Sequence, residues 1–126
     1  MVNITFNGVS QEIASIEEFG LALDRFDQHS EFELWVSIPA GPSMCMLRNG
    51  LFSWLMYLWI DDDADFSFSS RGDLTQTGDI AYTLSNGQVD RYPRSWCVDN
   101  DRCYQALAYF FVNGGAKPNW IIWQES

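Results

Sequence analysis

The order of apolar and polar residues along this chain predicts a helix near the N-terminus. Ser15 precedes Glu18 at the spacing of a capping box, in which each side chain bonds a free backbone N–H at the start of a helix. Apolar residues then recur at helical spacing, namely Ile16, Phe19, Leu23 and Phe26. Gly20 weakens the helix by up to about 1 kcal/mol, so we expect it to depend on packing against a sheet.

A second helix is predicted near the C-terminus. Its apolar face comprises Cys103, Ala106, Leu107, Phe110 and Phe111. Asp99 or Asn100 can cap its first turn, where a carboxylate also suits the helix dipole. The sequence Asn113-Gly114-Gly115 tolerates the left-handed backbone with which helices commonly end.

Between these helices the residues alternate with the period of β-strands. One such run places Phe32, Leu34, Val36 and Ile38 on one face and Glu33, Trp35 and Ser37 on the other. The pairs Asn49-Gly50 and Asn86-Gly87 are strong hairpin signals. They predict that Met44–Arg48 pairs with Leu51–Ile60, and Ile80–Leu84 with Gln88–Tyr92. Shorter strands are expected at residues 2–6, as a sheet edge, and at residues 66–69 and 120–123.

These elements predict a single α+β domain over residues 1–126, with a mostly antiparallel sheet and two helices packed on it. No repeat, linker or low-complexity segment divides the chain. With 47% hydrophobic residues, a chain of this length can bury a real core, which excludes an intrinsically disordered protein.

The strand predicted over Leu51–Ile60 is apolar on both faces. Its even positions are Phe52, Trp54, Met56, Leu58 and Ile60, and its odd positions include Ser53, Leu55, Tyr57 and Trp59. Either the second helix or the C-terminal segment covers the odd face, or Trp35, Tyr57 and Trp59 are partly exposed. Exposed Trp and Tyr side chains with charged neighbours are typical anchors of protein–protein interfaces. Trp54 and Trp96 are expected in the core.

Seventeen acidic against seven basic residues give the chain a net charge of −10. This charge repels phosphate groups, so we expect a basic protein as partner and neither nucleic acid nor an anionic membrane. The most apolar run, Leu51–Ile60, has ten residues, and a membrane-spanning helix needs about twenty. The N-terminus lacks the basic and apolar segments of a signal peptide. We therefore expect a cytoplasmic protein.

The groups on which catalysis most often depends are scarce. His29 is the single histidine, and its place after the first helix favours an interaction with the helix dipole. Cys97 and Cys103 can meet across a turn, although a cytosolic chain with three cysteines disfavours a disulfide. No zinc-ligand spacing, phosphate-binding loop or nucleophile motif occurs. We expect no catalytic residue, no metal and no cofactor.

An acidic run follows the long strand and comprises Asp61, Asp62, Asp63 and Asp65. Its first half resembles a calcium loop, but Phe66 and Gly72 stand where that loop needs its glycine and its glutamate. We interpret the run as a solvated loop that also offers a negative surface to a cationic partner.

Six segments in a fixed order carry a family likeness: Ser43–Gly50, Trp54–Leu58, Leu84–Gln88, Tyr92–Trp96, Tyr109–Phe111 and Gly114–Trp123. Together they resemble immunity-protein family one of bacterial polymorphic toxin systems, over about residues 40–125. Members are small α+β proteins with a C-terminal tryptophan, usually encoded beside a toxin of the deaminase superfamily. Ser53 departs from the pattern, which has glycine before the tryptophan, and this affects the local strand twist.

The resemblance implies a non-enzymatic immunity protein that binds a cognate toxin and occludes its active site. A deaminase toxin applies zinc-activated water to a base of its nucleic-acid substrate, so its groove is expected to be basic. Charge and strand parity, not the family, give the expected contact residues. Asp61, Asp62, Asp63 and Asp65 would complement the charge, and Trp35, Tyr57 and Trp59 would be anchors. Trp120 and Trp123 are expected to pack the last strand on the core.

Two other classes of function stay open. A small acidic hydrolase would use a pair of carboxylates, one of them with a raised pKa. An acidic mimic of nucleic acid would bind many basic proteins, whereas an immunity protein protects against its own toxin.

Overall fold

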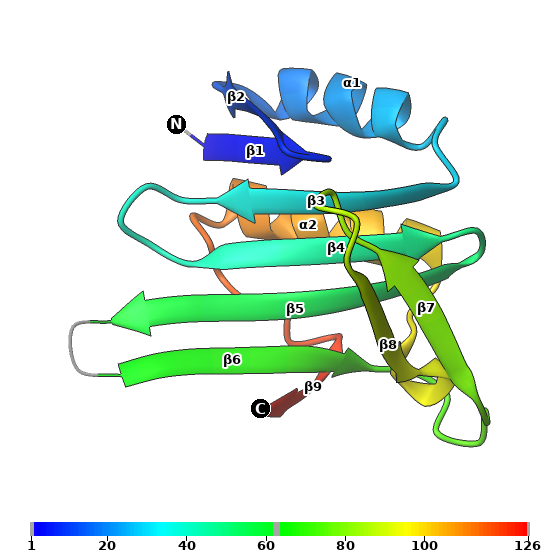
Figure 1. Ribbon diagram of the computed structural model, residues 1–126. Helices are drawn as coiled ribbons and strands as arrows, with labels where there is room; N and C mark the ends of the chain where they lie inside the picture. The colour runs from blue at the N-terminus through cyan, green and yellow to red at the C-terminus, as the bar shows by residue number, and fades with distance from the viewer. Residues whose placement is uncertain (1, 62–63, 126) are drawn as a thin grey trace.

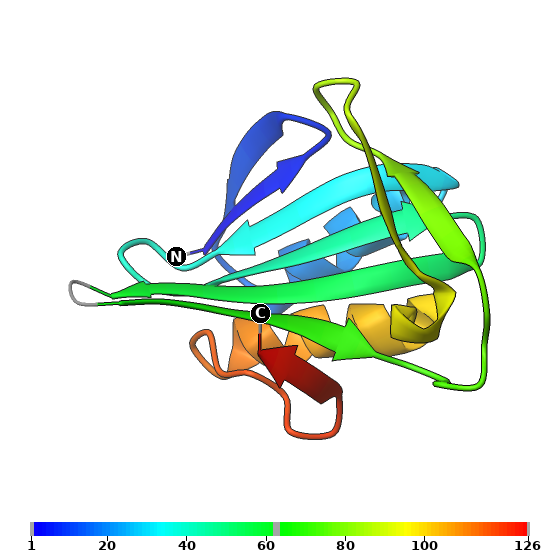
Figure 2. The ribbon, with the colours of Figure 1, turned by 60° about the horizontal axis from the view of Figure 1, so that its bottom comes forward.

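A computed structural model describes residues 2–61 and 64–125, without the side chains of Ile60, Asp61 and Ala64. In this part of the chain, two helices cover one face of a central sheet, and a short hairpin crosses one end of the opposite face (Figures 1 and 2). The prediction of an α+β fold with a mostly antiparallel sheet is confirmed.

The central sheet has seven strands in the described chain, each antiparallel to its neighbours. Their spatial order is β2 (Val9–Ile13), β1 (Val2–Phe6), β3 (Glu31–Ser37), β4 (Ser43–Asn49), β5 (Phe52–Asp61), β6 (Ala64–Arg71) and β9 (Ile122–Glu125). Helix α1 (Ile16–Phe26) connects β2 to β3. The segment between β6 and β9 carries β7 (Asp79–Thr83), β8 (Val89–Pro93), a 3-10 turn at Arg94–Trp96 and α2 (Asn100–Val112).

Both helices begin at the caps that the sequence predicts. The Ser15 Oγ accepts a hydrogen bond from the Glu18 N–H at 3.2 Å, and the Glu18 carboxylate accepts one from the Ala14 N–H at 3.3 Å. At the start of α2, Asp99 rather than Asn100 is the cap, because its Oδ1 accepts from the Arg102 N–H at 2.9 Å.

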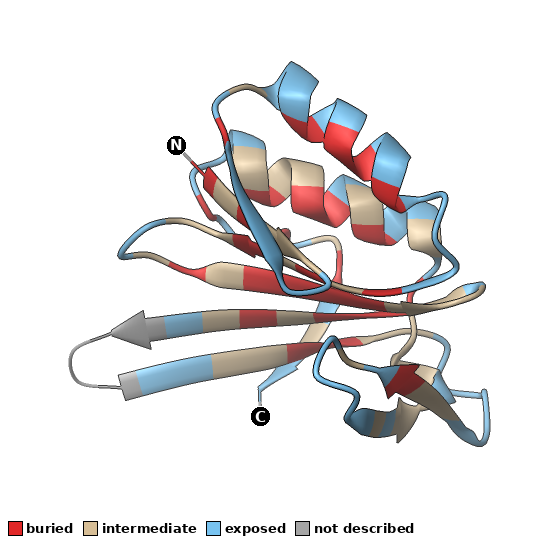
Figure 3. Ribbon diagram, turned by 45° about the horizontal axis from the view of Figure 1, so that its top comes forward, coloured by how far each residue is buried: buried red, intermediate tan, exposed pale blue. Residues whose placement is uncertain are grey.

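The larger core lies between the helices and the sheet. The helices contribute Phe19, Ala22, Leu23, Phe26, Cys103, Ala106, Leu107 and Phe110, and the sheet contributes residues that include Leu34, Val36, Met44, Met46, Leu55 and Tyr57. Figure 3 shows the buried stripes of both helices turned toward the sheet. The predicted helix faces are therefore confirmed, although Ile16 is exposed and Phe111 is partly buried.

A smaller core lies on the opposite face, beneath the β7–β8 hairpin. Cys45, Leu47, Trp54 and Tyr82 are buried there, and the Trp54 ring stacks on the Tyr92 ring with centroids 4.2 Å apart. Trp96 is partly buried against the same cluster. The even face of β5 thus packs under the hairpin at Trp54, while its odd face, including Leu55, packs under α2.

The structure corrects three expectations about the strands. Residues 2–6 are not at the sheet edge, because the unpredicted strand β2 lies outside them. The turn between β1 and β2 is Asn7-Gly8, with positive φ at both residues, so it is a third hairpin of the kind that Asn-Gly favours. The strand predicted at residues 66–69 extends over residues 64–71, and the last strand lies at Ile122–Glu125 rather than at residues 120–123.

Candidate functional surface

The described ends of β5 and β6 that lead into their connection extend past both helices (Figure 2). We call residues 57–61 and 64–68 the β5–β6 arm. Its strands are in register, so that Tyr57 pairs with Phe68 and Trp59 pairs with Phe66. Side chains two residues apart on a strand share a face, so these two cross-strand pairs follow one another on the helix side of the sheet.

The inner aromatic pair, Tyr57 and Phe68, is covered. Tyr57 is only 4% exposed, and its hydroxyl donates a hydrogen bond to the Gly115 carbonyl at 2.7 Å. The rings of Phe110 and Trp123 lie 6.1 and 6.3 Å from the Tyr57 ring. Burial raises the pKa of the Tyr57 hydroxyl. The second helix and the C-terminal segment therefore cover this face of β5 at Tyr57, as one of the two sequence interpretations expected, but they leave Trp59 exposed.

A lysine completes the cover of the inner pair. The Lys117 Nζ lies 3.4 Å from the Phe68 ring centroid and 5.9 Å from the Tyr57 ring centroid. Burial lowers the pKa of Lys117, and the nearby Glu125 carboxylate opposes that shift. An ammonium group at this distance over a ring is held by the ring quadrupole.

The outer aromatic pair, Trp59 and Phe66, is uncovered. Trp59 is 46% exposed and Phe66 is 43% exposed. Two large exposed side chains at paired positions of neighbouring strands are typical of an interaction site on a small protein.

The acidic run expected to surround these rings is described only in part. Asp65 is exposed, and it pairs in register with Ile60. Asp61 ends β5, but its side chain lies outside the described residues, and so do Asp62 and Asp63. The contact roles expected for these four carboxylates stay predictions.

The other two predicted anchors do not join the outer pair. Tyr57 belongs to the core, so for this residue the alternative in which it is partly exposed is wrong. Trp35 lies on the opposite face, partly buried in the smaller core, and its indole N–H donates to the Glu33 carboxylate at 3.1 Å. Burial alone would raise the pKa of Glu33, but hydrogen bonds from the Ser85 hydroxyl, the Trp35 indole and the Ser85 N–H lower it.

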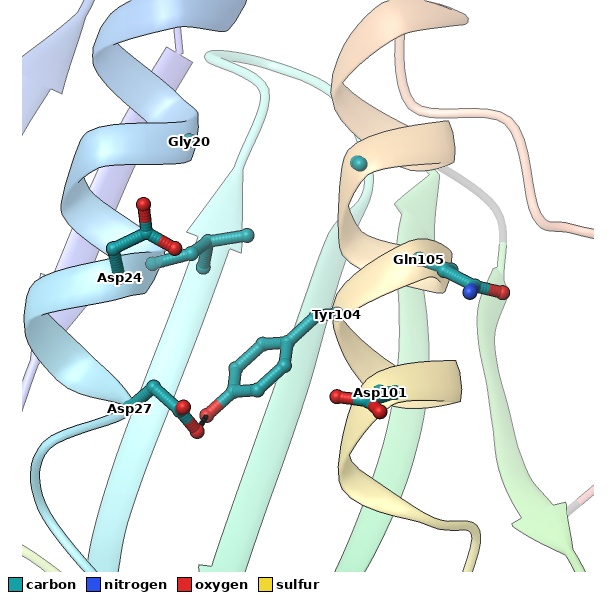
Figure 4. Close-up of a pocket in the computed structure, with 8 residues that line it drawn as sticks. Gly20, Asp24, Asp27, Asp101, Tyr104 and Gln105 are labelled. Atoms are coloured by element: carbon teal, nitrogen blue, oxygen red, sulfur yellow. Dashed lines mark hydrogen bonds between the residues drawn. The ribbon is translucent and has the colours of Figure 1, made fainter.

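The sequence did not predict a groove that lies between α1 and α2 (Figure 4). It has a volume of about 330 Å³ and is lined by Gly20, Leu23, Asp24, Asp27, Asp101, Tyr104, Gln105 and Ala108. The Tyr104 hydroxyl donates to the Asp27 carboxylate at 2.8 Å, and the Arg48 guanidinium bonds the same carboxylate oxygen at 2.8 Å. Burial and the bond to Asp27 raise the pKa of Tyr104. No pattern on either helix alone signals the groove, because it needs both helices side by side.

The histidine and the three cysteines lie in the part of the chain that the structure describes. It holds no cluster of three or more His, Cys, Asp or Glu side chains placed to bind a metal ion. All three cysteines are free, and burial raises the pKa of each thiol, so none is an activated nucleophile. His29 is exposed, with its ring 5.3 Å from the Phe6 ring.

An uncovered aromatic pair on an acidic molecule is characteristic of a protein that binds other proteins. The family model described as Immunity protein Imm1 matches residues 7–125, and the chain belongs to this family of immunity proteins. The match confirms the resemblance read from residues 40–125 and extends it to β2, α1 and β3. No curated protein sequence matches the chain.

Membership of this family implies a toxin as the partner. The described helices include none that is long and apolar enough to cross a membrane. Ser53, where the sequence pattern departs from the family, is buried in β5 and its hydroxyl donates to the Asn100 side-chain carbonyl at the start of α2.

Proposed function

We propose that this immunity protein binds one cognate polymorphic toxin, a zinc-dependent deaminase of nucleic acids or nucleotides, and occludes its active site or substrate groove. The observation that carries the proposal is the outer aromatic pair, Trp59 and Phe66, which is uncovered on an arm that carries acidic residues. The protein acts by binding alone, in the cytoplasm, where the nucleic-acid substrate of such a toxin is found.

Charge supports a basic toxin surface as the target. A deaminase groove that attracts phosphate groups is positively charged. A molecule of charge −10 is steered toward such a groove, which raises the association rate more than the final affinity. Asp61, Asp62, Asp63 and Asp65 concentrate part of this charge at the arm, next to the outer pair in sequence.

We propose Trp59 as the anchor of the interface. A fully desolvated Trp at the centre of an interface of about 1,600 Å² is a common hot spot. Tyr57 is held in the core by the hydrogen bond from its hydroxyl to the Gly115 carbonyl. Trp35 lies on the opposite face of the sheet, where its indole N–H donates to the Glu33 carboxylate. We therefore assign neither of them an anchoring role.

The carboxylates give no support to a hydrolase. A glycosidase-type acid needs a raised pKa. Among the described carboxyl groups, Glu33 and Asp73 have a clearly shifted pKa, and hydrogen bonds lower the pKa of both. At Asp73 the main hydrogen bonds come from the Thr75 hydroxyl and the Thr75 N–H. An acidic mimic of nucleic acid would bind many basic proteins, whereas an immunity protein binds its own toxin, so the range of proteins inhibited distinguishes the two functions.

Co-expression with a candidate toxin, sought in the gene beside its own, tests the proposal. We expect cells that express both proteins to grow, the two proteins to co-purify, and an unrelated basic nuclease to remain active in the presence of this protein. Trp59→Ala should abolish protection at low expression, whereas Val9→Ala, at another exposed apolar residue, should retain it. Cells killed despite soluble, folded immunity protein would contradict the proposal, and protection against unrelated nucleases would favour the mimic.

A further inference from the structure

We propose that the outer aromatic pair, Trp59 and Phe66, receives an arginine or lysine side chain of the partner, as the inner pair receives Lys117. This inference rests on the proposed function and names what the toxin places on the arm.

The two pairs form one continuous aromatic row. Tyr57 faces Phe68 and, two residues further along each strand, Trp59 faces Phe66. Two residues of antiparallel strand span about 7 Å. A cation over the outer pair would therefore lie about 7 Å from the Lys117 ammonium. Lys117 belongs to the segment after α2, and its ammonium group lies over the rings of the inner pair. The side chains of the outer pair are exposed.

Cations over rings are a general feature of this molecule. Five of its seven basic side chains lie over aromatic rings, namely Arg48, Arg71, Arg94, Arg102 and Lys117. Arg71 is the closest of the arginines, with its Cζ 3.9 Å from the Trp96 ring centroid. None of these contacts involves Trp59 or Phe66, so the outer pair has no internal cation among the described contacts.

Charge complementarity selects the occupant. The exposed carboxylate of Asp65 adjoins Phe66 in sequence, and the whole molecule has a charge of −10. A cation over the rings gains from the ring quadrupole and from the net negative potential of the molecule, and these outweigh repulsion by the solvent-screened Lys117 ammonium about 7 Å away. A second copy of this chain would bring another charge of −10 to the same place, and an anionic ligand would be repelled.

A fluorine NMR titration without toxin tests the inference. The probe is the peptide acetyl-(Gly-Arg)3-amide, and acetyl-(Gly-Gln)3-amide is its uncharged control. The protein is labelled with 5-fluorotryptophan at its six Trp positions, and the Trp59 signal is identified by its loss in Trp59→Phe. We expect the arginine peptide to shift the Trp59 signal saturably and the glutamine peptide to leave it unchanged.

Two variants locate the peptide. Phe66→Leu keeps an apolar side chain in the strand but removes one ring, and it should weaken binding of the arginine peptide about threefold, as expected for an exposed cation–π contact. Asp24→Asn, in the inter-helix groove, should change the affinity much less. Five unchanged Trp signals in Phe66→Leu would show that the fold is retained.

The inference is overturned if the Trp59 signal does not move, if the uncharged peptide moves it equally, or if Asp24→Asn weakens binding while Phe66→Leu does not. Toxin protection together with an unmoved Trp59 signal would reject this inference and leave the proposed function. A saturable shift without any protection would reject the proposed function and leave the cation site.

Discussion

Individual polar side chains tie the sheet to the elements on both of its faces. On the helix side, the Tyr57 hydroxyl holds the Gly115 carbonyl after α2, and the buried Ser53 hydroxyl bonds Asn100. Ser70, also buried, accepts from the Leu55 N–H at 3.1 Å and donates to the Trp96 carbonyl at 2.9 Å. A buried polar group that loses its partner is costly, so these residues fix the elements that pack on the two faces of the sheet.

Tyr57→Phe tests whether Tyr57 serves the core rather than an interface. Loss of the 2.7 Å bond leaves a buried carbonyl without its donor, so the free energy of unfolding in urea should fall by about 1–2 kcal/mol. Toxin affinity should stay within about twofold, since the ring remains in place.

Trp59→Ala is the matched variant at the exposed position and should behave in the opposite way. Its stability should change little, whereas dissociation from the toxin should accelerate by about 30-fold or more, as for a hot-spot residue. Unchanged stability with weakened binding in Tyr57→Phe would place that hydroxyl in the interface instead.

Glu33 gives the contact between β3 and the β7–β8 hairpin a pH dependence. Hydrogen bonds from Ser85 and Trp35 outweigh burial and hold its folded pKa below the ordinary value of 4.5. Its stabilisation is therefore complete above pH 4.5 and is lost as the pH falls through the lower, folded pKa. Glu33→Gln should lower the free energy of unfolding at pH 7 by only about 0.5–1 kcal/mol, because solvent screens this partly exposed carboxylate.

The difference between Glu33→Gln and the parent should shrink in urea titrations below pH 4. A difference that stays constant from pH 7 to pH 3 would contradict the assigned role of the carboxylate.

At the scale of elements, the helices were predictable because caps and apolar stripes are local signals. Ser15, Asp99 and the two stripes identify α1 and α2. The strand β2 was missed because it is exposed at four of its five residues and has no alternating apolar face. Its turn, Asn7-Gly8, carries the same Asn-Gly signal that identified the other two hairpins. The sequence therefore contained enough information to predict β2.

The candidate surface was predictable only in part, for a topological reason. Strand parity places Tyr57 and Trp59 on one face, but which of them is covered depends on where α2 ends and where the chain after it returns. The Gly115 carbonyl contacts Tyr57, and the Lys117 ammonium lies over the rings of Tyr57 and Phe68. None of these contacts involves Trp59 or Phe66. Phe66 became a candidate only through its register with Trp59. The inter-helix groove likewise depends on packing between α1 and α2.

Two glycines test how the elements are packed. Gly20 lies in α1 with open space where a Cβ would stand, so Gly20→Ala should raise the free energy of unfolding by about 0.5–1 kcal/mol through helix propensity. A Cβ on Gly72 would overlap the Cys97 carbonyl, which belongs to the backbone beside β6. Gly72→Ala should lower the free energy of unfolding by about 2–3 kcal/mol.

Urea denaturation of both glycine variants gives the comparison. Equal stability of Gly72→Ala and the parent would mean that the segment around Cys97 does not pack against the end of β6.

At the scale of the whole molecule, the distribution of charge determines how it meets a partner. Most of its few cations are used internally over aromatic rings, and carboxylates dominate the net charge of −10. Such a molecule presents negative potential to a basic surface at a distance and aromatic contacts at close range. That residues 1–126 form a single domain stays a prediction.

Replacing the four aspartates of the acidic run, Asp61, Asp62, Asp63 and Asp65, by asparagine should separate these two effects. The change reduces the net charge from −10 to −6, so association with the toxin should slow by about tenfold at low salt and depend less on ionic strength. Thermal stability should hardly change.

The matched control removes four exposed carboxylates away from the arm, Glu12, Glu17, Glu31 and Asp79, with the same change in charge. Stopped-flow association rates over a range of salt concentrations should show a smaller effect for this control. Equal effects of the two variants would remove the arm from the interface and leave only the net charge.

Titration of toxin turnover with the purified protein tests most directly whether neutralisation is achieved by binding. With toxin at a concentration well above the dissociation constant, we expect its activity to fall linearly to zero at one equivalent of this protein. The protein alone should not alter the toxin's substrate. Full toxin activity at several equivalents, or conversion of the substrate or product by the isolated protein, would contradict a role as a binding immunity protein.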